Sequence, residues 1–364
     1  MQPVAAPEPL VLRAAQALLP DGLAPASVLV RDGAVAAVGR SLDAPGVRVV
    51  EVDVLAPGFV DLHVHAVDGC GIVGPAPDVP GLARALAAHG VTSFLATTVT
   101  APVEELLPLL SATAHGGARL AGLHLEGPWL SPDHVGAQPP QHLALPSLPD
   151  LERLVAAGPP VLLTMAPELP GGMDVLRRAT EAGVVVSVGH SGVTYDQALA
   201  AFDMGARHVT HCFNAMLPLH HREPGLVGAA LDRPEVTVEV IADGVHLHPA
   251  TVRLVWRAAG PERVCVVSDA VELDVPEARS DGTATRRPDG TLAGSRTGLD
   301  AMLRNLVAWG VPLADALTMA SVTPARVLGR RAALEVGAVA DLVVLDADLH
   351  VVSTVVDGEV VWQR

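Results

Sequence analysis

The chain alternates apolar runs with helix-like segments from residue 55 onward, and this alternation most limits the folds open to it. The eight runs are LAPGFVDLHVH (55–65), VTSFLATTV (91–99), LAGLHLEGP (120–128), VLLTMAPE (161–168), VVVSVGH (184–190), HVTHCFNAM (208–216), VTVEVIADGVH (236–246) and RVCVVSDA (263–270). Helical patterns between them cover 102–116, 150–158, 174–183, 196–205 and 250–260. Apolar strands alternating with helices are typical of a parallel sheet buried on both faces. Eight such units predict an α/β fold, a (β/α)8 TIM-like barrel.

Both ends of the chain are rich in β-strand patterns instead. Short strands are predicted within 26–54, with a hairpin turn at Asp32-Gly33, and within 341–364, with a turn at Asp357-Gly358. We expect residues 1–54 and 332–364 to form a small β-sandwich domain and residues 55–331 to form the barrel. The polar, glycine-rich segment 271–295 predicts a long loop or lid before a helix over 299–310.

Composition excludes several classes of function. All 24 basic residues are arginine, so lysine Schiff bases, pyridoxal phosphate anchoring and a P-loop lysine are excluded. The net charge of -16 argues against a nucleic-acid partner. No apolar run reaches the roughly 18 residues of a membrane span, and the N-terminus lacks the basic start of a signal peptide. The three cysteines show no metal or redox spacing, which indicates a reducing, cytoplasmic compartment.

Ionisable side chains stand at the ends of the predicted barrel strands, where barrel enzymes build their sites. They are His63, His65, Glu126, His190, His211, His246 and Asp269. His63 and His65 are two residues apart, so both point to one side of an extended strand and offer half a metal site. Burying so many ionisable groups together is costly unless a cation compensates them. The strand ends therefore predict a metal site.

The same stretches resemble the amidohydrolase superfamily, and specifically its N-acetylglucosamine-6-phosphate deacetylases. The motifs occur in family order: PGFVDLHVH (57–65), LHLEGPWL (123–130), GHS (189–191), THCFNAM (210–216), REPGLVGA (222–229), ADGVH (242–246), SDA (268–270) and LAGS (292–295). PGFVDLHVH is specific only to the superfamily, whereas the combination of HLEGPWL, THCFNAM and REPGLVGA points to the deacetylases.

The resemblance implies a hydrolase that releases acetate from an N-acetyl amino-sugar 6-phosphate. Glu126, His190 and His211 would bind one divalent metal, with His63 and His65 completing a second site and Glu126 as the bridge. Zinc is the first expectation, with iron, manganese and cobalt as alternatives. Asp269 would be the general acid/base.

Substrate contacts are implied for Asn214, Ala215, Arg222 and His246, with Arg222 reaching the site of a neighbouring subunit in a homodimer. Gln138 stands where the family usually has a histidine that touches the sugar, and this departure leaves the identity of the sugar open. Two other readings remain: another amidohydrolase, such as an N-acyl-amino-acid deacylase or cyclic-amide hydrolase, and a non-catalytic sugar-phosphate-binding protein.

Overall fold

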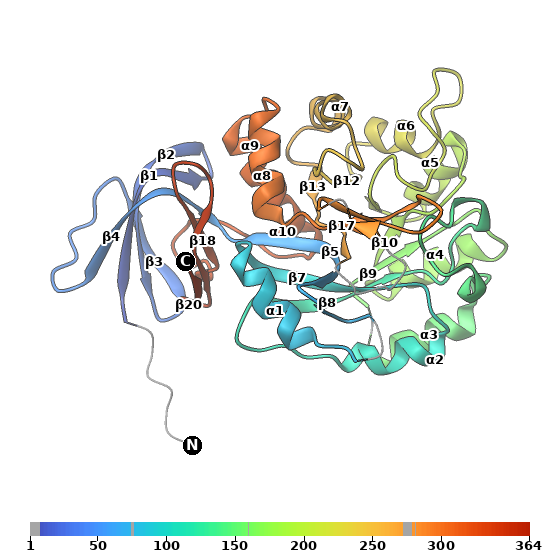
Figure 1. Cartoon of the computed structure of the whole chain (residues 1–364), viewed down its shortest axis with the longest axis horizontal. Helices are drawn as coiled ribbons and strands as arrows, with labels where there is room; N and C mark the ends of the chain where they lie inside the picture. Colours follow the sequence, from blue (N-terminus) through green and yellow to red (C-terminus); the bar gives the residue numbers. More distant parts are fainter. Residues whose placement is uncertain (1–7, 74–75, 159, 272–278, 281) are drawn as a thin grey trace.

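The computed structural model describes residues 8–73, 76–158, 160–271, 279–280 and 282–364 (Figure 1). Its strands form two sheets, one of seven strands and one of thirteen. The smaller sheet lies at the left of Figure 1 and combines blue and red strands, from the two ends of the chain. The larger sheet lies at the right, with helices around it.

The larger sheet contains the eight predicted barrel strands in sequence order. They are β5 (Phe59–Val67), β7 (Val91–Thr98), β8 (Arg119–Glu126), β9 (Leu162–Met165), β10 (Val185–Val188), β11 (His208–Val209), β12 (Thr237–Val240) and β13 (Val264–Val266). All neighbours pair in parallel. The eighth run continues into β14 (Ala270–Val271), which pairs in parallel with β5. The first and eighth runs therefore meet, and the α/β, TIM-like barrel is confirmed.

Helices follow the strands as the sequence predicts. The α-helices are α1 (Val79–Ala88), α2 (Val103–Leu106), α3 (Leu148–Ala157), α4 (Gly172–Glu181), α5 (Tyr195–Asp203), α6 (Gly225–Asp232), α7 (Pro249–Ala259), α8 (Leu299–Ala308), α9 (Leu313–Leu317) and α10 (Thr323–Val327). Short turns of other helix types are η1 (Leu107–Ser111), η2 (Pro132–His134), η3 (Pro140–His142) and η4 (Thr318–Val322). In the described part of the chain, no helix has the length and apolar character to cross a membrane.

Burial explains why the barrel strands read as continuous apolar runs. Every residue of β5 and β7 is buried, since a strand in a helix-covered parallel barrel has no solvent face. Parallel strands also end at the same edge of the sheet. Polar residues at the carboxyl ends of different runs are therefore gathered at one mouth of the barrel.

Two predicted segments differ from the structure. The helix expected over 102–116 is only α2 followed by η1, because Pro108 lacks the N–H that a continuing α-helix needs. The loop expected over 271–295 contains β15 (Arg279–Ser280), β16 (Ala284–Arg286) and β17 (Leu292–Ser295), and β17 pairs with β14. Residues 272–278 and 281 of that segment lie outside the described residues. A further short strand, β6 (Cys70–Gly71), pairs with β5.

The smaller sheet has the order β20-β19-β18-β4-β1-β2-β3. Its strands are β1 (Leu10–Leu19), β2 (Gly22–Arg31), β3 (Ala34–Gly39), β4 (Arg48–Pro57), β18 (Leu342–Leu345), β19 (Val351–Val356) and β20 (Glu359–Gln363). Both predicted hairpin turns are present. Asp32 and Gly33 have φ of 51° and 76°, and Asp357 and Gly358 have φ of 50° and 78°, as a type I′ turn requires. Strand β1 was not predicted, because its sequence LVLRAAQALL does not alternate cleanly.

Candidate metal centre and substrate pocket

A pocket of about 210 Å³ opens at the carboxyl ends of the barrel strands. Nine of the predicted site residues line it: His65, Glu126, Gln138, His190, His211, Asn214, Ala215, His246 and Asp269. His63 lies directly beneath, fully buried. Residues 291–294, on and just before β17, also line the pocket. The segment predicted as a lid thus contributes strand residues to its wall.

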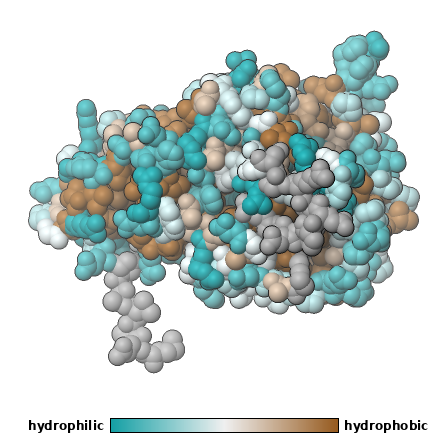
Figure 2. All heavy atoms as spheres, viewed as in Figure 1, coloured by the Kyte–Doolittle hydropathy of each residue, from teal (hydrophilic) through white to brown (hydrophobic). Residues whose placement is uncertain are grey.

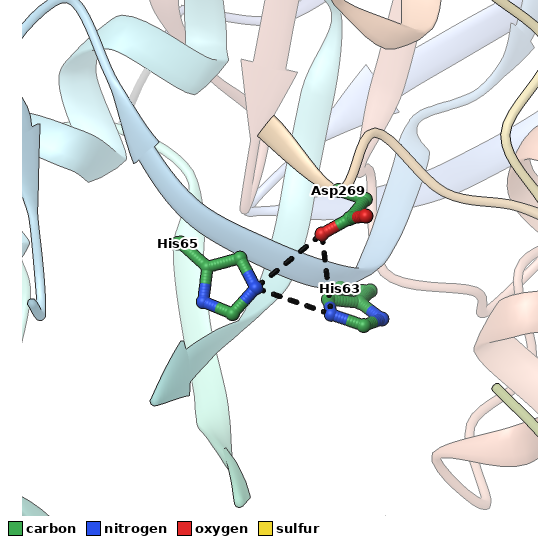
Figure 3. Close-up of side chains that lie close together, drawn as sticks. All are labelled: His63, His65 and Asp269. Carbon is green, nitrogen blue, oxygen red and sulfur yellow. Dashed lines mark hydrogen bonds and ion pairs between the residues drawn. The ribbon is translucent and has the colours of Figure 1, made fainter. Parts of the chain in front are cut away.

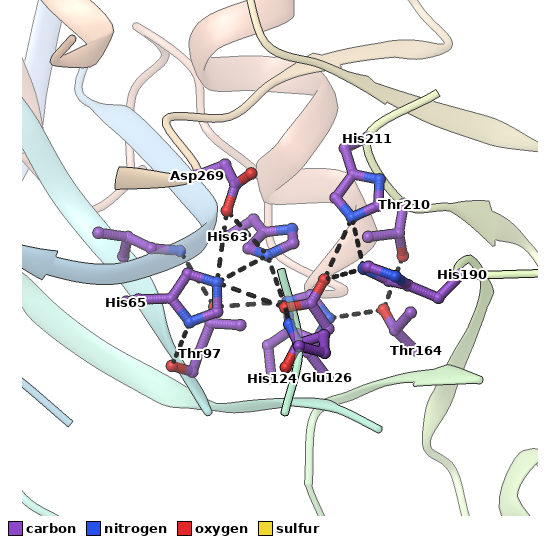
Figure 4. A network of polar contacts seen from close by, with 12 residues as sticks. His63, His65, Thr97, His124, Glu126, Thr164, His190, Thr210, His211 and Asp269 are labelled. Carbon is purple, nitrogen blue, oxygen red and sulfur yellow. Dashed lines mark hydrogen bonds and ion pairs between the residues drawn. The ribbon is translucent and has the colours of Figure 1, made fainter. Parts of the chain in front are cut away.

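The carboxylate of Glu126 stands at the centre of the cluster (Figure 4). Its Oε1 lies 3.0 Å from Nε2 of His190 and 3.1 Å from Nε2 of His211. These two ring nitrogens are themselves 3.1 Å apart. Strand ends β8 and β10 and the turn after β11 therefore bring three ligand atoms of the kinds that divalent metals bind to one point.

A second group faces the other oxygen of Glu126. His63 and His65 converge as predicted, with their Nε2 atoms 3.3 Å apart. Asp269 Oδ1 lies 3.4 Å from the first and 3.3 Å from the second (Figure 3). Glu126 Oε2 is 3.6 Å from Nε2 of His63 and 3.4 Å from Nε2 of His65. One carboxylate therefore lies between two potential metal sites.

Hydrogen bonds at the far side of the rings direct the Nε2 lone pairs toward the centre. Nδ1 of His65 lies 3.0 Å from the carbonyl oxygen of Thr97, and Nδ1 of His190 lies 2.9 Å from that of His134. A carbonyl only accepts, so each Nδ1 must donate, and a neutral ring then keeps its lone pair on Nε2. Lone pairs facing carboxylate oxygens repel one another. The donor set therefore fits a divalent cation bound among them.

The pKa shifts of the clustered residues also indicate a site that favours positive charge. Burial alone would lower the pKa of His63, yet the carboxylates of Glu126 and Asp269 raise it well above its usual value. Burial opposes the change at His65 as well, but Asp269 and Glu126 bring its pKa to about 8. Conversely, His63 and the other rings hold the pKa of Glu126 well below its usual range, although burial would raise it. The cluster attracts positive charge, which protons supply when no metal ion does.

Three of these residues have left-handed backbones. The φ angles are 48° at His190, 27° at His211 and 45° at Asp269. Non-glycine residues in sparsely populated conformations cost about 1–3 kcal/mol each and gather at functional sites. At these strand ends the chain turns so that each side chain points into the mouth of the barrel.

Three of the predicted substrate contacts, Asn214, Ala215 and His246, line the pocket, whereas Arg222 does not. Nδ1 of His246 lies 2.7 Å from Asp243 Oδ2, and Asn214 Nδ2 donates to the carbonyl oxygen of His211 at 3.1 Å. Arg222 is exposed and does not line the pocket. Its Nη1 lies 2.8 Å from Nε2 of His221. Within this one chain, Arg222 is the only predicted site residue that the fold leaves apart from the others.

Gln138 is buried and both ends of its amide are occupied. The Thr100 N–H donates to Oε1 at 2.8 Å, and Nε2 donates to Glu126 Oε2 at 2.5 Å. The residue lines the pocket, so it stands beside any ligand there. Its amide is nevertheless directed at the central carboxylate.

Sequence reasoning missed two buried residues of the cluster. Glu239 on β12 and His124 on β8 are both fully buried and lie against His63. The available signal was a charged residue inside an apolar run, TVEV, and a histidine two residues before Glu126, on the same side of the strand.

Comparisons with known proteins agree with this geometry. The amidohydrolase family model matches residues 54–361. The N-acetylgalactosamine-6-phosphate deacetylase of Escherichia coli O157:H7 is 38% identical, over 96% of this chain and 98% of the relative. The human N-acetylglucosamine-6-phosphate deacetylase is 38% identical, over 85% of this chain and 84% of the relative.

A solved structure shares the fold throughout. It is a variant of N-acetyl-D-glucosamine-6-phosphate deacetylase from Mycobacterium smegmatis in complex with N-acetyl-D-glucosamine-6-phosphate. It is 35% identical, with a TM-score of 0.90, and the match covers 98% of this chain and 100% of that one. The chain therefore belongs to the amidohydrolase family and, within it, to the N-acetylglucosamine-6-phosphate deacetylase family, as the strand-end motifs predicted.

Proposed function

We propose that the chain is a metal-dependent hydrolase that removes the N-acetyl group from N-acetylglucosamine-6-phosphate or a closely related amino-sugar 6-phosphate. The observation that carries the proposal is the central carboxylate of Glu126. It has histidine Nε2 atoms on both sides, at the floor of a pocket at the barrel mouth. Relatives at 38% identity are named as deacetylases of such sugar phosphates.

The residues that would hold the metal form two groups that share Glu126. Glu126, His190 and His211 would hold one divalent ion, and His63, His65 and Asp269 surround the place for a second. Nitrogen and oxygen ligands of this kind suit zinc, iron, manganese or cobalt. A bound divalent ion would supply a Lewis acid that polarises the acetamide carbonyl and makes water a better nucleophile at neutral pH.

Asp269 would move the proton in this reaction. It lines the pocket, and its side chain is 13% exposed, more than any ligand group around it. The carboxylate accepts a proton from water as the water oxygen bonds to the carbonyl carbon. It then returns the proton to the amide nitrogen as the C–N bond breaks, giving acetate and a free amine. The return is needed because an amine anion is too basic to leave.

The phosphate needs local cations, because the chain as a whole carries a net charge of -16. Pocket residues Asn214, Ala215, His246 and Gln138 would contact the sugar and its phosphate. Arg222 would reach the pocket of a second copy in a homodimer. In support, the segment before α6 projects from the barrel and is hydrophilic at its tip (Figure 1, Figure 2). Leu217 and Leu219, which precede α6, are 37% and 41% exposed, as residues that bury against a partner would be.

We also propose the domain boundaries and the setting. Residues 1–54 and 332–364 would form the small β-sandwich domain and residues 55–331 the catalytic barrel. Many apolar residues of β1, β2, β3, β18 and β19 share one core cluster, which supports a domain of their own. Other residues of the same sheet pack with the barrel core: Leu18, Val54, Val343, Leu345 and Val351. A reducing, cytoplasmic setting with no nucleic-acid or membrane partner fits the acidic charge and the three cysteines, which form no disulfide.

The direct test combines metal analysis with acetate release. The purified chain is expected to contain a divalent metal and to release acetate from N-acetylglucosamine-6-phosphate, from its galacto epimer, or from both. It should act poorly on the unphosphorylated sugar. Preference for the galacto epimer would move the substrate assignment to that sugar. A chain that contains metal but prefers N-acyl amino acids or cyclic amides would make it another amidohydrolase, and an inactive chain without metal would make it a binding protein.

Glu126→Gln is expected to lose most of the bound metal and the activity, because an amide keeps the shape but not the charge that holds a cation. Metal per chain and thermal unfolding should be measured together, with the metal-free wild type as the reference for folding. The control is Asp300→Asn, which neutralises a carboxylate that binds His89 outside the cluster and should keep its metal. Normal metal content in Glu126→Gln would make Glu126 a structural residue.

Asp269→Asn is expected to lower kcat by about 10²-fold or more at saturating metal, the usual scale for removing a general acid/base. KM should change much less, because the amide does not remove a proposed contact to the sugar or its phosphate. Steady-state kinetics across pH would check this. A variant with near-normal kcat at any pH would rule out the proton-transfer role.

Arg222→Ala is expected to raise KM for the phosphorylated sugar by about 10- to 100-fold, because a hydrogen bond to a charged group contributes about 1.5–3 kcal/mol. The slow reaction on the unphosphorylated sugar should be unchanged. The control, Arg177→Ala, removes another exposed arginine, which pairs with Asp174 and Glu181 on α4. Equal losses on both sugars would assign Arg222 to folding or assembly instead of phosphate binding.

A further inference from the structure

Glu239 is a fully buried carboxylate that the proposed chemistry does not use. It lies on β12, in the short sequence TVEV, and it does not line the pocket. A buried charge is costly unless hydrogen bonds compensate it. The hydrogen bonds that compensate the charge of Glu239 therefore indicate what the residue does.

The two oxygens of Glu239 receive three N–H donors. Oε2 lies 3.0 Å from Nδ1 of His63 and accepts the backbone N–H of His211 at 3.0 Å. Oε1 lies 3.1 Å from Nε2 of His208, whose Nδ1 is 2.6 Å from Oγ1 of Thr237. The Thr237 hydroxyl has one hydrogen, which it can give to that Nδ1 or to the carbonyl oxygen of Arg207 at 3.1 Å. When it donates to Nδ1, a neutral His208 ring gives its N–H to Glu239. Both oxygens of the buried carboxylate therefore have hydrogen-bond partners.

The contact with His63 decides which of its nitrogens faces the pocket floor. An ionised carboxylate only accepts, so Nδ1 of His63 carries the hydrogen and Nε2 keeps its lone pair. That Nε2 is the atom 3.3 Å from Nε2 of His65 and 3.4 Å from Asp269 Oδ1. Glu239 is therefore the hydrogen-bond acceptor for Nδ1 of His63, as backbone carbonyl oxygens are for Nδ1 of His65 and of His190.

Glu239 also contacts the group formed by Glu126, His190 and His211, through the backbone of His211. The φ of His211 is 27°, and the bond from its N–H to Glu239 holds the backbone in that conformation. The ring of His211 then reaches Glu126 Oε1. Glu239 thus contacts one residue of each group around Glu126. It contacts the ring of His63 in one group and the backbone N–H of His211 in the other.

A third metal site is the alternative use of this cluster, since His63, His124 and Glu239 also bring ligand atoms together. The hydrogen bonds argue against it. Nδ1 of His124 lies 3.1 Å from the carbonyl oxygen of Leu62, and its Nε2 lies 2.7 Å from Oγ1 of Thr164. Both ring nitrogens are occupied, so His124 has no lone pair left for a metal ion.

We propose that Glu239 is a positioning residue that fixes the tautomer of His63 and the backbone of His211, and so sets the affinity of the His63, His65 and Asp269 group for a divalent ion. The inference rests on the proposed metal-dependent function. Carboxylates that hold the far nitrogen of a metal-binding histidine typically change metal affinity by about 10- to 100-fold when they are removed.

The test is a cobalt titration of the metal-free chain, followed by equilibrium dialysis and by the visible spectrum of the bound ion. The wild type is expected to bind two ions. In Glu239→Gln, the weaker ion should bind about 10- to 100-fold less tightly, with a changed spectrum, while the ion at Glu126, His190 and His211 is affected less. Glu239→Asp should behave as an intermediate, and the control Asp300→Asn should bind as the wild type does.

A second measurement needs no variant at Glu239. In the zinc-loaded wild type, nitrogen-15 spectra of the histidine rings, with His63 assigned from His63→Asn, should show the hydrogen of His63 on Nδ1. A hydrogen on Nε2, a wild type that takes only one ion, or a Glu239→Gln chain with unchanged affinity for both ions would overturn the proposal. A wild type that binds no ion would overturn the proposed metal-dependent function itself.

Discussion

The site depends on the carboxylate of Glu126, around which four imidazole rings present their Nε2 atoms. Acceptors behind three of those rings hold the N–H groups outward, so the lone pairs point inward at the carboxylate. Such a cluster is unfavourable without added positive charge, which protons or a metal ion can supply. Much of the polar structure at the barrel mouth follows from this one requirement.

The packing of the barrel core determines where the strand ends lie, and so it brings these rings to the carboxylate of Glu126. Strands β5 and β8 are anchored by fully buried residues such as Leu62 and Leu125, which alternate with the site residues along each strand. Because the strands are parallel, their carboxyl ends share one edge, and side chains from sequence positions as distant as His63 and Asp269 meet there. The backbone cost of the left-handed residues at these ends is carried by the packing beneath them.

The sequence predicted the barrel, the order of its strands and the convergence of the His63 and His65 pair, because these follow from apolar periodicity and a two-residue spacing. It could not predict which acceptor lies behind each ring, since that depends on strand register. Glu239 was therefore missed: it touches His63 from a strand that begins more than a hundred residues later. The position of Arg222 could not be predicted either, because the sequence of an exposed loop has no periodic pattern that indicates where its side chains lie. The truncated helix α2 was predictable in principle from Pro108.

Gln138 stands where the family resemblance implies a histidine, and its contacts direct it to the central carboxylate. The Thr100 N–H can only donate, so it fixes Oε1 of the amide, and Nε2 must then donate to Glu126. The oxygen that receives this bond, Oε2, is the one that faces His63 and His65. A cation bound at the second group would therefore share that oxygen with a neutral donor, which withdraws part of the negative charge that the oxygen offers. The amide still has a second N–H on Nε2, and the residue lines the pocket, so contact with a sugar and a hydrogen bond to the central carboxylate are compatible in one side chain.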